Sequence, residues 1–474
     1  MDTLKSAKGR ALINPIPIDH LANRTNGQLR GESISYGAVS IDSRTLERGD
    51  LFVAIKGDNF DGHEYIEQAV KAGCCAVVVN ESHRANGVNS AHLSEQSDVT
   101  SLSVQDTQLA LGEAALINRE LFAGPVIGLT GSSGKTSTKN MLAAILDQKG
   151  RACATEGNFN NEIGVPLTLL NLDSSHHYAV IEMGARSEGD IKYLTGIVKP
   201  DLAILLNAGL SHVDVFGSYE NIVKAKGEIF ESLSDDGIAV VNVDDPASDK
   251  WLSSISAQTI FSFSLSQNCA DIFASEIKCD IESSSFNLNY KGKTQKINLP
   301  VPGEHNVHNS LAAASAAVCL GFELAVISEG LASLESSKGR LNTINLRNGI
   351  TLVDDSYNAN PASMRASLDV LNLRSGAKIA VLGEMGELGQ RSKSLHVELA
   401  EYAVKTQINQ FYLIGPFADA MQKIIGSRAS CHSEKQEIST LISSELIGDE
   451  TILVKGSRST GMDDVVEYLT SRFK

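Results

Sequence analysis

The stretch that decides the fold is "GLTGSSGKTSTKNMLAAIL", residues 128–146. The apolar residues 126–129 predict a β-strand, and the residues from Lys135 onward predict an amphipathic helix. Between them, the small residues Gly131 to Gly134 allow backbone N–H groups to surround an oxyanion. The stretch therefore predicts a phosphate-binding loop at the junction of a strand and a helix.

Two side chains of this stretch add specific chemistry. Lys135 supplies a positive charge, and Thr136 offers its hydroxyl to Mg²⁺. The general consensus places a glycine where this chain has Leu129, so an ordinary strand-to-helix turn is the alternative. Because strand, glycines, Lys-Thr pair and helix occur in the required order, we interpret the stretch as a nucleotide site. Its candidate residues are Gly131, Ser132, Ser133, Gly134, Lys135, Thr136 and Ser137.

Length and composition limit the possible classes of protein. A chain of 474 residues exceeds one hydrophobic core, and 42% hydrophobic residues suffice for several. The net charge of −16 argues against nucleic acid as a partner. No apolar run approaches the roughly 20 residues that span a bilayer, and the first 20 residues lack a secretory core, so we expect a cytoplasmic protein. The seven cysteines show no Cys-x-x-Cys spacing, which predicts neither a disulfide framework nor a zinc site.

The alternation of strands and helices predicts an α/β protein of three domains. Residues 1–103 form a small α/β unit in which 81–103 is expected to be loop. Residues 104–336 contain the phosphate loop and recurring strand-helix units typical of a mainly parallel sheet, followed by an antiparallel addition over 272–299. Residues 337–474 repeat the alternation in a second, smaller, Rossmann-like wound sheet. No coiled coil is indicated; the oligomeric state stays open, with a monomer as the simplest expectation.

Polar residues at predicted strand ends are candidates for chemistry, because ligands of open α/β sheets bind there. Glu182 ends one strand and His212 follows another, and both suit a metal beside the phosphate loop, although loop anchors are the alternative. Lys226 lies on a helix with Lys224, Glu220 and Glu228, for which a solvated, charge-paired surface is the simplest interpretation.

Two further motifs contain amide and acidic side chains. In "PGEHNVHN", Asn306 and Asn309 open an alanine-rich helix, where they either read a base or cap the helix. "VDDSYNANP" ends a strand at Asp355 and continues with Tyr357, Asn358 and Asn360 before a helix beyond Pro361. The nearby Arg340 suits phosphate contacts, with an exposed structural arginine as the alternative.

The ordered set "TGSSGKTS", "GNFNNEIGVPLTLL", "EMGA", "AKGEI", "PGEHNVHN", "GRL" and "DDSYNANP" resembles the Mur ligases, the ATP-dependent amide-forming enzymes of bacterial peptidoglycan synthesis. The resemblance spans nearly the whole chain, and "TGxxGKT" is the form of the phosphate loop in that family. "DDSYNANP", "GNFNNEIGVP" and "LGEMGELG" are most similar to the branch that adds D-alanyl-D-alanine to UDP-N-acetylmuramoyl-tripeptide.

The resemblance implies roles for the candidate residues. The first domain would bind the UDP-sugar peptide, the second ATP, and the third the dipeptide and part of ATP. ATP would phosphorylate the tripeptide carboxylate, with Lys135 catalytic and with two Mg²⁺ ions held by Thr136, Glu182 and His212. Lys226 would be carbamylated by CO₂ and become an oxygen ligand, which reverses the surface interpretation of its helix.

Further roles are implied for the remaining residues. Asn306 and Asn309 would lie near adenine, with Arg340 and Asp355 on ATP. Tyr357, Asn358 and Asn360 would lie near the acceptor dipeptide. Ser43 and Arg44 would face the uridine diphosphate, and Asn158, Asn160 and Asn161 the sugar-peptide, although plain turns also explain asparagine-rich loops. Residues 338–340 lie where a hinge for domain closure is expected.

Several alternatives stay open. The branch that adds a diamino acid would carry a "DNPR"-type motif, which is absent here, and folylpolyglutamate synthetase would lack the "DSR" opening. A phosphate-loop ATPase that forms no amide would hydrolyse ATP without a muramyl peptide. The sequence leaves lysine and diaminopimelate equally open as the third residue of the peptide. Glu384, Glu387 and His396 fit either a dipeptide contact or a structural loop, and Lys455 and Arg458 either an anion contact or surface charge.

Overall fold

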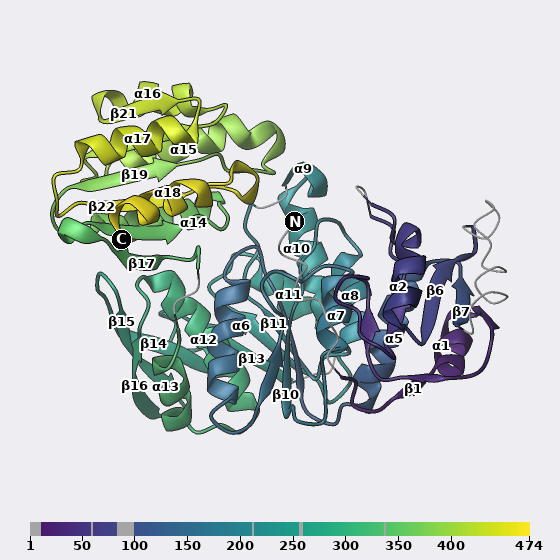
Figure 1. Ribbon diagram of the computed structural model, residues 1–474. Coiled ribbons are helices and arrows are strands. Elements are labelled where there is room, and N and C mark those ends of the chain that lie inside the picture. The colour runs from purple at the N-terminus through teal and green to yellow at the C-terminus, as the bar shows by residue number, and fades with distance from the viewer. Residues whose placement is uncertain (1–10, 58–59, 83–98, 211–212, 256–258, 336–337) are drawn as a thin grey trace.

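The structure is a computed structural model that describes residues 11–57, 60–82, 99–210, 213–255, 259–335 and 338–474. Three sheets of five, nine and six strands form in chain order, with a small two-stranded ribbon beside the first. Figure 1 shows the six-stranded sheet above the nine-stranded one, and the five-stranded sheet at the side. The predicted α/β class is confirmed. The candidate metal ligand His212 lies outside the described residues.

The first sheet has the order β2-β7-β6-β5-β4. Its strands are β2 (Gln28–Arg30), β4 (Val39–Ser40), β5 (Leu51–Val53), β6 (Ala76–Asn80) and β7 (Thr100–Val104); the ribbon pairs β1 (Ile16–Pro17) with β3 (Ser35–Tyr36). Only β2 runs antiparallel to its neighbour. The helices are α1 (Ile18–Thr25), the 3₁₀ turn η2 (Gly62–Tyr65) and α2 (Ile66–Ala72).

The prediction of loop up to residue 103 is wrong at its end, because Thr100–Val104 is strand β7. All five of its residues are buried, and it lies between β2 and β6. The strand was not predicted because "TSLSV" contains only two apolar residues among its serines and threonine, too few for a recognisable hydrophobic pattern. Small hydroxyl side chains can be buried in a sheet when their oxygens find acceptors, as Thr100 does on the carbonyl of Glu32 at 2.8 Å.

The middle sheet has the order β16-β15-β14-β13-β12-β11-β8-β10-β9. Its parallel strands are β8 (Val126–Thr130), β9 (Ala152–Ala154), β10 (Tyr178–Glu182), β11 (Leu202–Leu205), β12 (Ile238–Asn242) and β13 (Thr259–Ser264). The strand β14 (Ile272–Cys279) continues them in parallel, and β15 (Ser284–Tyr290) and β16 (Lys293–Leu299) add antiparallel pairs. The mainly parallel sheet with an antiparallel addition is confirmed.

Helices cover both faces of this sheet. One face packs on α6 (Lys135–Leu146), α12 (Glu304–Cys319) and α13 (Leu324–Ala332). The other packs on α5 (Thr107–Leu121), α7 (Gly164–Leu169), α8 (Asp190–Val198), α10 (Tyr219–Gly227), η3 (Glu228–Phe230) and α11 (Ser248–Ser254). The short α9 (Val213–Phe216) lies between α8 and α10 in the chain. Helix α5 also contacts α1, and one apolar core runs without interruption from the first sheet through α5 to the middle sheet. The predicted boundary between the first and middle domains, between residues 103 and 104, stays a prediction.

The C-terminal sheet has the order β17-β18-β22-β19-β20-β21. Its strands are β17 (Asn342–Asn345), β18 (Thr351–Asp355), β19 (Lys378–Leu382), β20 (Gln410–Ile414), β21 (Ala429–His432) and β22 (Thr451–Lys455), all parallel except β17. One face packs on α14 (Pro361–Asn372), α15 (Ser392–Val404) and α16 (Ala418–Ile425), the other on α17 (Lys435–Glu445) and α18 (Asp463–Phe473). The 3₁₀ turns are η4 (Arg347–Gly349), η5 (Gly389–Arg391), η6 (Gly426–Arg428) and η7 (Arg458–Thr460). The second wound sheet is confirmed, and the edge strand β21 was not predicted.

Over the part of the chain that the structure describes, no helix has the length and apolarity that a bilayer crossing requires.

Candidate active site

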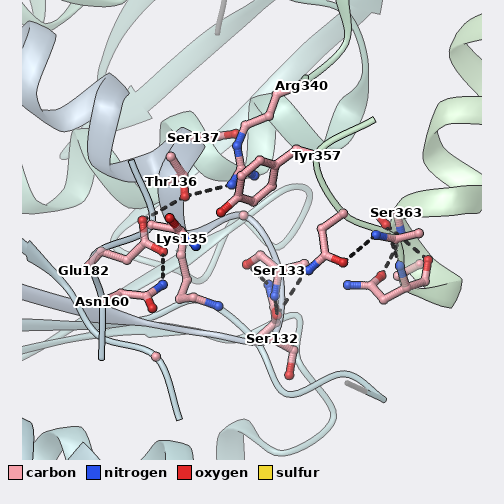
Figure 2. Close-up of a pocket in the computed structure, with 18 of the residues that line it drawn as sticks. Ser132, Ser133, Lys135, Thr136, Ser137, Asn160, Glu182, Arg340, Tyr357 and Ser363 are labelled. Carbon is pink, nitrogen blue, oxygen red and sulfur yellow. Dashed lines mark hydrogen bonds between the residues drawn. The ribbon is translucent and has the colours of Figure 1, made fainter. Parts of the chain in front are cut away.

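A cavity of about 1010 Å³ lies between the middle and C-terminal sheets. Its walls come from the phosphate loop, the ends of β10 and β11, the start of α12, and the ends of β18 and β22. Each of these strands ends toward the cavity, as expected for ligand sites of open α/β sheets. Figure 2 shows side chains of both domains meeting there.

The phosphate loop is held by residues that follow β11. The backbone N–H of Ser133 donates to Oδ1 of Asn207 at 3.0 Å, and Ser132 Oγ donates to the carbonyl of Gly209 at 3.0 Å. Gly134 is the N-cap of α6 and has a φ of +81°, and a Cβ there would lie 2.3 Å from Oδ1 of Asn309. Only glycine satisfies both conditions. Leu129, where the consensus has glycine, is buried in the apolar core and takes no part in the loop.

Five side chains from five segments of the chain converge beside this loop (Figure 2). Thr136 Oγ1 donates to Oε2 of Glu182 at 2.8 Å, and Asn160 Nδ2 donates to Oε1 of Glu182 at 2.7 Å. Arg340 of the C-terminal domain donates to Thr136 Oγ1 at 3.0 Å, and its guanidinium lies 4.3 Å from the ring centroid of Tyr357. The structure therefore joins residues that are up to 204 positions apart in the chain.

The cations around Glu182 are desolvated. Removal from water lowers the pKa of Lys135, whose Nζ donates to the carbonyl of Gly131 at 2.7 Å. Lys226 is 2% exposed, and burial, together with repulsion from Lys135, lowers its pKa to about 7. The surface interpretation is wrong for Lys226 but right for Lys224, which forms an exposed ion pair with Glu188. Glu228, also buried, accepts the backbone N–H of Gly189 at 2.7 Å.

The donor set fits magnesium. Thr136 and Glu182 supply a hydroxyl and a carboxylate that already face one another, and Mg²⁺ is typically bound through one or two carboxylates with several waters. Within the described ranges, which exclude His212, no three His, Cys, Asp or Glu side chains gather into a metal-binding group. CO₂ reacts with the unprotonated form of an amine. Because the pKa of Lys226 is about 7, a substantial fraction of its amine is unprotonated at neutral pH, which fits carbamylation.

The C-terminal wall is a closed network around Asp355. Lys455 Nζ donates to Asp355 Oδ2 at 2.6 Å and to the carbonyl of Asn358 at 3.0 Å. Ser367 Oγ donates to the same carboxylate oxygen at 2.5 Å. Lys455 is 3% exposed, so the surface-charge alternative is wrong for it. Asn360 Oδ1 accepts the backbone N–H of Ser363 at 2.8 Å in a capping box of α14, which commits its carbonyl to the helix.

Helix capping does not explain the two asparagines of α12. The N-cap is Gly303, and no side chain caps this helix. Asn306 Nδ2 instead donates to the carbonyl of Pro302 at 2.8 Å, and Asn309 packs against Gly134. Both amides are buried and line the cavity.

The remaining predicted residues divide into two groups. Asn158, Asn160 and Asn161 line the cavity, although Asn161 Oδ1 also accepts the backbone N–H of Gly164 at the start of α7, at 2.9 Å. Ser43 and Arg44 do not line it. They lie in the first domain, where Ser43 Oγ donates to Gln68 and Arg44 pairs with Asp42 at 2.6 Å.

The ambiguous residues are also placed by the structure. His396 is buried and bridges the backbone N–H of Met385, at 3.0 Å, and the carbonyl of Ser392, at 2.7 Å, so the structural-loop interpretation fits it. Glu387 and Arg458 line the cavity, and Glu384 does not. Arg458 is 59% exposed and pairs with Asp463 at 3.0 Å.

Sequence reasoning missed several residues that line the cavity, among them Asn207, Arg186 and Tyr193. It also missed Lys139, which does not line the cavity but donates to the carbonyl of Thr155. Asn207 could have been found, because it lies two residues beyond the end of β11, close to the edge of the sheet where the other strand-end candidates lie. Lys139 lies one helical turn after Lys135, a spacing that places both on one face of α6.

Comparisons with known proteins agree with this geometry. Family models match residues 35–119 (Mur ligase family, catalytic domain), 129–317 (Mur ligase middle domain) and 339–458 (Mur ligase, glutamate ligase domain). The UDP-N-acetylmuramoyl-tripeptide--D-alanyl-D-alanine ligase of Escherichia coli K12 is 38% identical, over 96% of this chain and 98% of the relative.

Two solved structures are similar over nearly their whole length. MurF from Acinetobacter baumannii superposes with a TM-score of 0.88 at 35% identity, covering 97% of this chain and 99% of that one. MurF from Thermotoga maritima in complex with ADP has a TM-score of 0.80 at 30% identity, covering 91% and 97%.

Together with a phosphate loop that faces a second wound domain across one cavity, these comparisons define an ATP-dependent amide-forming ligase. The chain belongs to the Mur ligase family.

Proposed function

We propose that this chain joins D-alanyl-D-alanine to UDP-N-acetylmuramoyl-tripeptide at the expense of ATP, which gives the pentapeptide precursor of peptidoglycan. The observation that carries the proposal is the single cavity in which the phosphate loop and Glu182 face Arg340 and Tyr357 of the C-terminal domain. The activity carried by relatives that match the whole chain supports the choice of substrates. A cytoplasmic location follows from these substrates.

The reaction has two steps. A carboxylate oxygen of the tripeptide attacks the γ-phosphorus of ATP, and ADP leaves. The amine of D-alanyl-D-alanine then attacks the acyl carbon, phosphate leaves with the bonding electrons, and the new amide loses a proton. Since acyl phosphates hydrolyse readily, the cavity must exclude water while the intermediate exists.

The residues of the middle domain stabilise the negative charge of the phosphoryl group. Backbone N–H groups of the loop and Lys135 surround the phosphates, and Thr136 and Glu182 would hold Mg²⁺. When bound, Mg²⁺ neutralises phosphate charge and orients the phosphates. His212 would help to hold a second ion, and Lys226, if carbamylated, would offer it an anionic oxygen.

The other walls are assigned to the two peptide substrates and to the rest of ATP. Asn306 and Asn309 are assigned to adenine, Arg340 to the phosphates, and Asn158, Asn160 and Asn161 to the sugar-peptide. Tyr357 and Asn358 are assigned to the dipeptide, whereas Asp355 and Asn360 act through Lys455 and the cap of α14. Ser43 and Arg44 are assigned to uridine diphosphate in the first domain, with domain limits at 1–103, 104–336 and 337–474.

The test is phosphate release from ATP with UDP-muramyl-tripeptide, with and without D-alanyl-D-alanine, followed by mass analysis of the nucleotide product. We expect release that needs both substrates and a product heavier by one dipeptide less water. A product heavier by one diamino acid, formed from the muramyl dipeptide, would assign the chain to the tripeptide-forming branch instead. Release indifferent to both peptides would leave only an ATPase.

A further inference from the structure

We propose that Lys139 is a positioning residue that fixes the loop of residues 155–161 and, through it, the carboxylate of Glu182. Lys139 does not line the cavity, and none of the roles proposed above uses it. The inference rests on the proposed function, because it concerns the same nucleotide and sugar-peptide site.

The side chain of Lys139 ties α6 to this loop. It is 3% exposed, and its Nζ donates to the carbonyl of Thr155 at 2.5 Å and to that of Gly157 at 3.4 Å. Lys139 lies one turn after Lys135, so the helix that presents Lys135 and Thr136 to the cavity also anchors residues 155 and 157.

The loop in turn holds Glu182 at two points. Thr155 Oγ1 accepts the backbone N–H of Glu182 at 2.9 Å. At the other end of the loop, Asn160 Nδ2 donates to the Glu182 carboxylate at 2.7 Å, and the carbonyl of Asn160 accepts the N–H of Gly184 at 2.8 Å. Lys139 is therefore the tie between the helix that carries Thr136 and the loop that orients its partner Glu182.

The charge of Lys139 also has an electrostatic effect. Among the described residues, its hydrogen-bond acceptors are two carbonyls and no carboxylate, and an ammonium buried without an anion is costly. Burial lowers the pKa of Lys139, and the charge of Glu182 opposes that shift. The ammonium of Lys139 therefore also attracts the carboxylate that would hold Mg²⁺. An apolar side chain of equal length would fill the space without this effect.

The phosphate loop itself does not depend on Lys139, because Asn207 and Gly209 hold it from β11. Removing the ammonium should therefore separate two properties that a general loss of structure would change together. Binding of ADP without Mg²⁺ should persist, whereas the gain in affinity from Mg²⁺ and the recognition of the sugar-peptide should weaken.

The experiment compares Lys139→Met with the wild type and with Lys378→Met. Lys378 is a matched control, since it is 7% exposed, donates to the backbone carbonyl of Asn372, and lies outside the cavity. Calorimetry gives the ADP affinity with and without Mg²⁺, kinetics give the KM of UDP-muramyl-tripeptide, and thermal unfolding gives Tm.

For Lys139→Met we expect at least about a tenfold loss in the Mg²⁺-dependent gain of ADP affinity and about a tenfold higher KM for the sugar-peptide, with Mg²⁺-free ADP affinity and Tm retained. Lys139→Gln keeps a neutral hydrogen-bond donor. Its KM for the sugar-peptide should therefore lie between those of Lys139→Met and the wild type, whereas its gain in ADP affinity from Mg²⁺ should stay closer to that of Lys139→Met. Equal Mg²⁺ effects and KM values in wild type and Lys139→Met would overturn the proposal. If the wild type shows no ligase activity, the proposed function fails, and the ADP measurements still decide the role of Lys139.

Discussion

The hydroxyl of Thr136 is shared between two domains. A hydroxyl has one proton and two lone pairs. In Thr136 the proton goes to Glu182, and one lone pair accepts from Arg340. Among the described residues no second donor reaches this oxygen, and Thr136 lines the cavity. This small group therefore links the Glu182 carboxylate to a C-terminal guanidinium and leaves a lone pair for a ligand.

Substitution of Thr136 tests this shared role. Thr136→Val keeps the shape and removes the hydroxyl, so we expect kcat/KM to fall by about 100-fold, on the order of 3 kcal/mol. Thr136→Ser keeps the hydroxyl and should stay within about tenfold of wild type. Steady-state kinetics at saturating Mg²⁺ measure both, and equal activity of the valine and serine variants would contradict the role.

The buried amine of Lys226 predicts a pH-dependent stability. Its pKa is about 7 in the fold and 10.5 ordinarily, so between these pH values the unfolded chain binds the extra proton and stability rises with pH. Below pH 7 the buried amine of Lys226 is protonated, so the full cost of burying its charge lowers the free energy of unfolding. In CO₂-free buffer, Lys226→Met should therefore raise the free energy of unfolding at pH 6, on the order of a few kcal/mol, with a smaller gain toward pH 10.

Urea unfolding of both proteins at pH 6 and 9 measures this difference. Bicarbonate at pH 8 should stabilise only the wild type, because the variant lacks the buried amine of residue 226. A stability difference that is independent of pH would show that Lys226 keeps its ordinary pKa.

The burial of Lys226 could have been predicted from its spacing. It lies four positions after Ile222 and three after Val223, both buried, which places all three on the inward face of α10. Charge counting suggested a surface because Glu220, Lys224 and Glu228 surround it in sequence. Helical periodicity and charge pairing thus conflicted, and tertiary packing decided in favour of periodicity.

Helix α14 begins with a capping box, in which the side chains of Asn360 and Ser363 each accept the backbone N–H of the other residue. Asn360→Ala should lower the stability of the C-terminal domain by about 1 kcal/mol, whereas Asn360→Asp should retain most of it. Denaturant unfolding measures the change. A large rise in the KM of D-alanyl-D-alanine with unchanged stability would instead make Asn360 a dipeptide ligand.

Strand ends were the most informative elements for locating the site. Glu182 and Asp355 each end a predicted strand, Lys455 ends β22, and the structure brings all three to the cavity. Strands β7 and β21 escaped prediction because their short sequences contain too many polar residues for a hydrophobic pattern. Their burial depends on neighbouring strands that local sequence does not reveal.

At the scale of the whole molecule, the three wound sheets were predictable from alternation, but their mutual packing was not. Ten of the fifteen residues of α5 are buried, so this helix is covered nearly all round. Its sequence indicated a helix that opens the middle domain. Only the structure shows that it also contacts α1 of the first domain.

Domain closure is the prediction at this scale. Arg340 already donates to Thr136, Tyr357 lines the same cavity, and Arg374, 8% exposed, lies 3.6 Å from Glu282 at the turn between β14 and β15. We expect an ATP analogue with both peptide substrates to reduce the radius of gyration about a hinge at residues 338–340. Small-angle scattering checks this, and identical curves with and without ligands would contradict it.

The continuous core through α5 has a consequence for how the molecule melts. The first and middle domains share one apolar cluster, whereas the clusters of the C-terminal domain consist of residues from 341 onward, with Leu210 at their margin. Cooperative unfolding follows shared packing, so the ligand-free protein should show two calorimetric transitions rather than three. A ligand bound in the cavity touches both units, and saturation with nucleotide should draw the two heat-absorption peaks together into one.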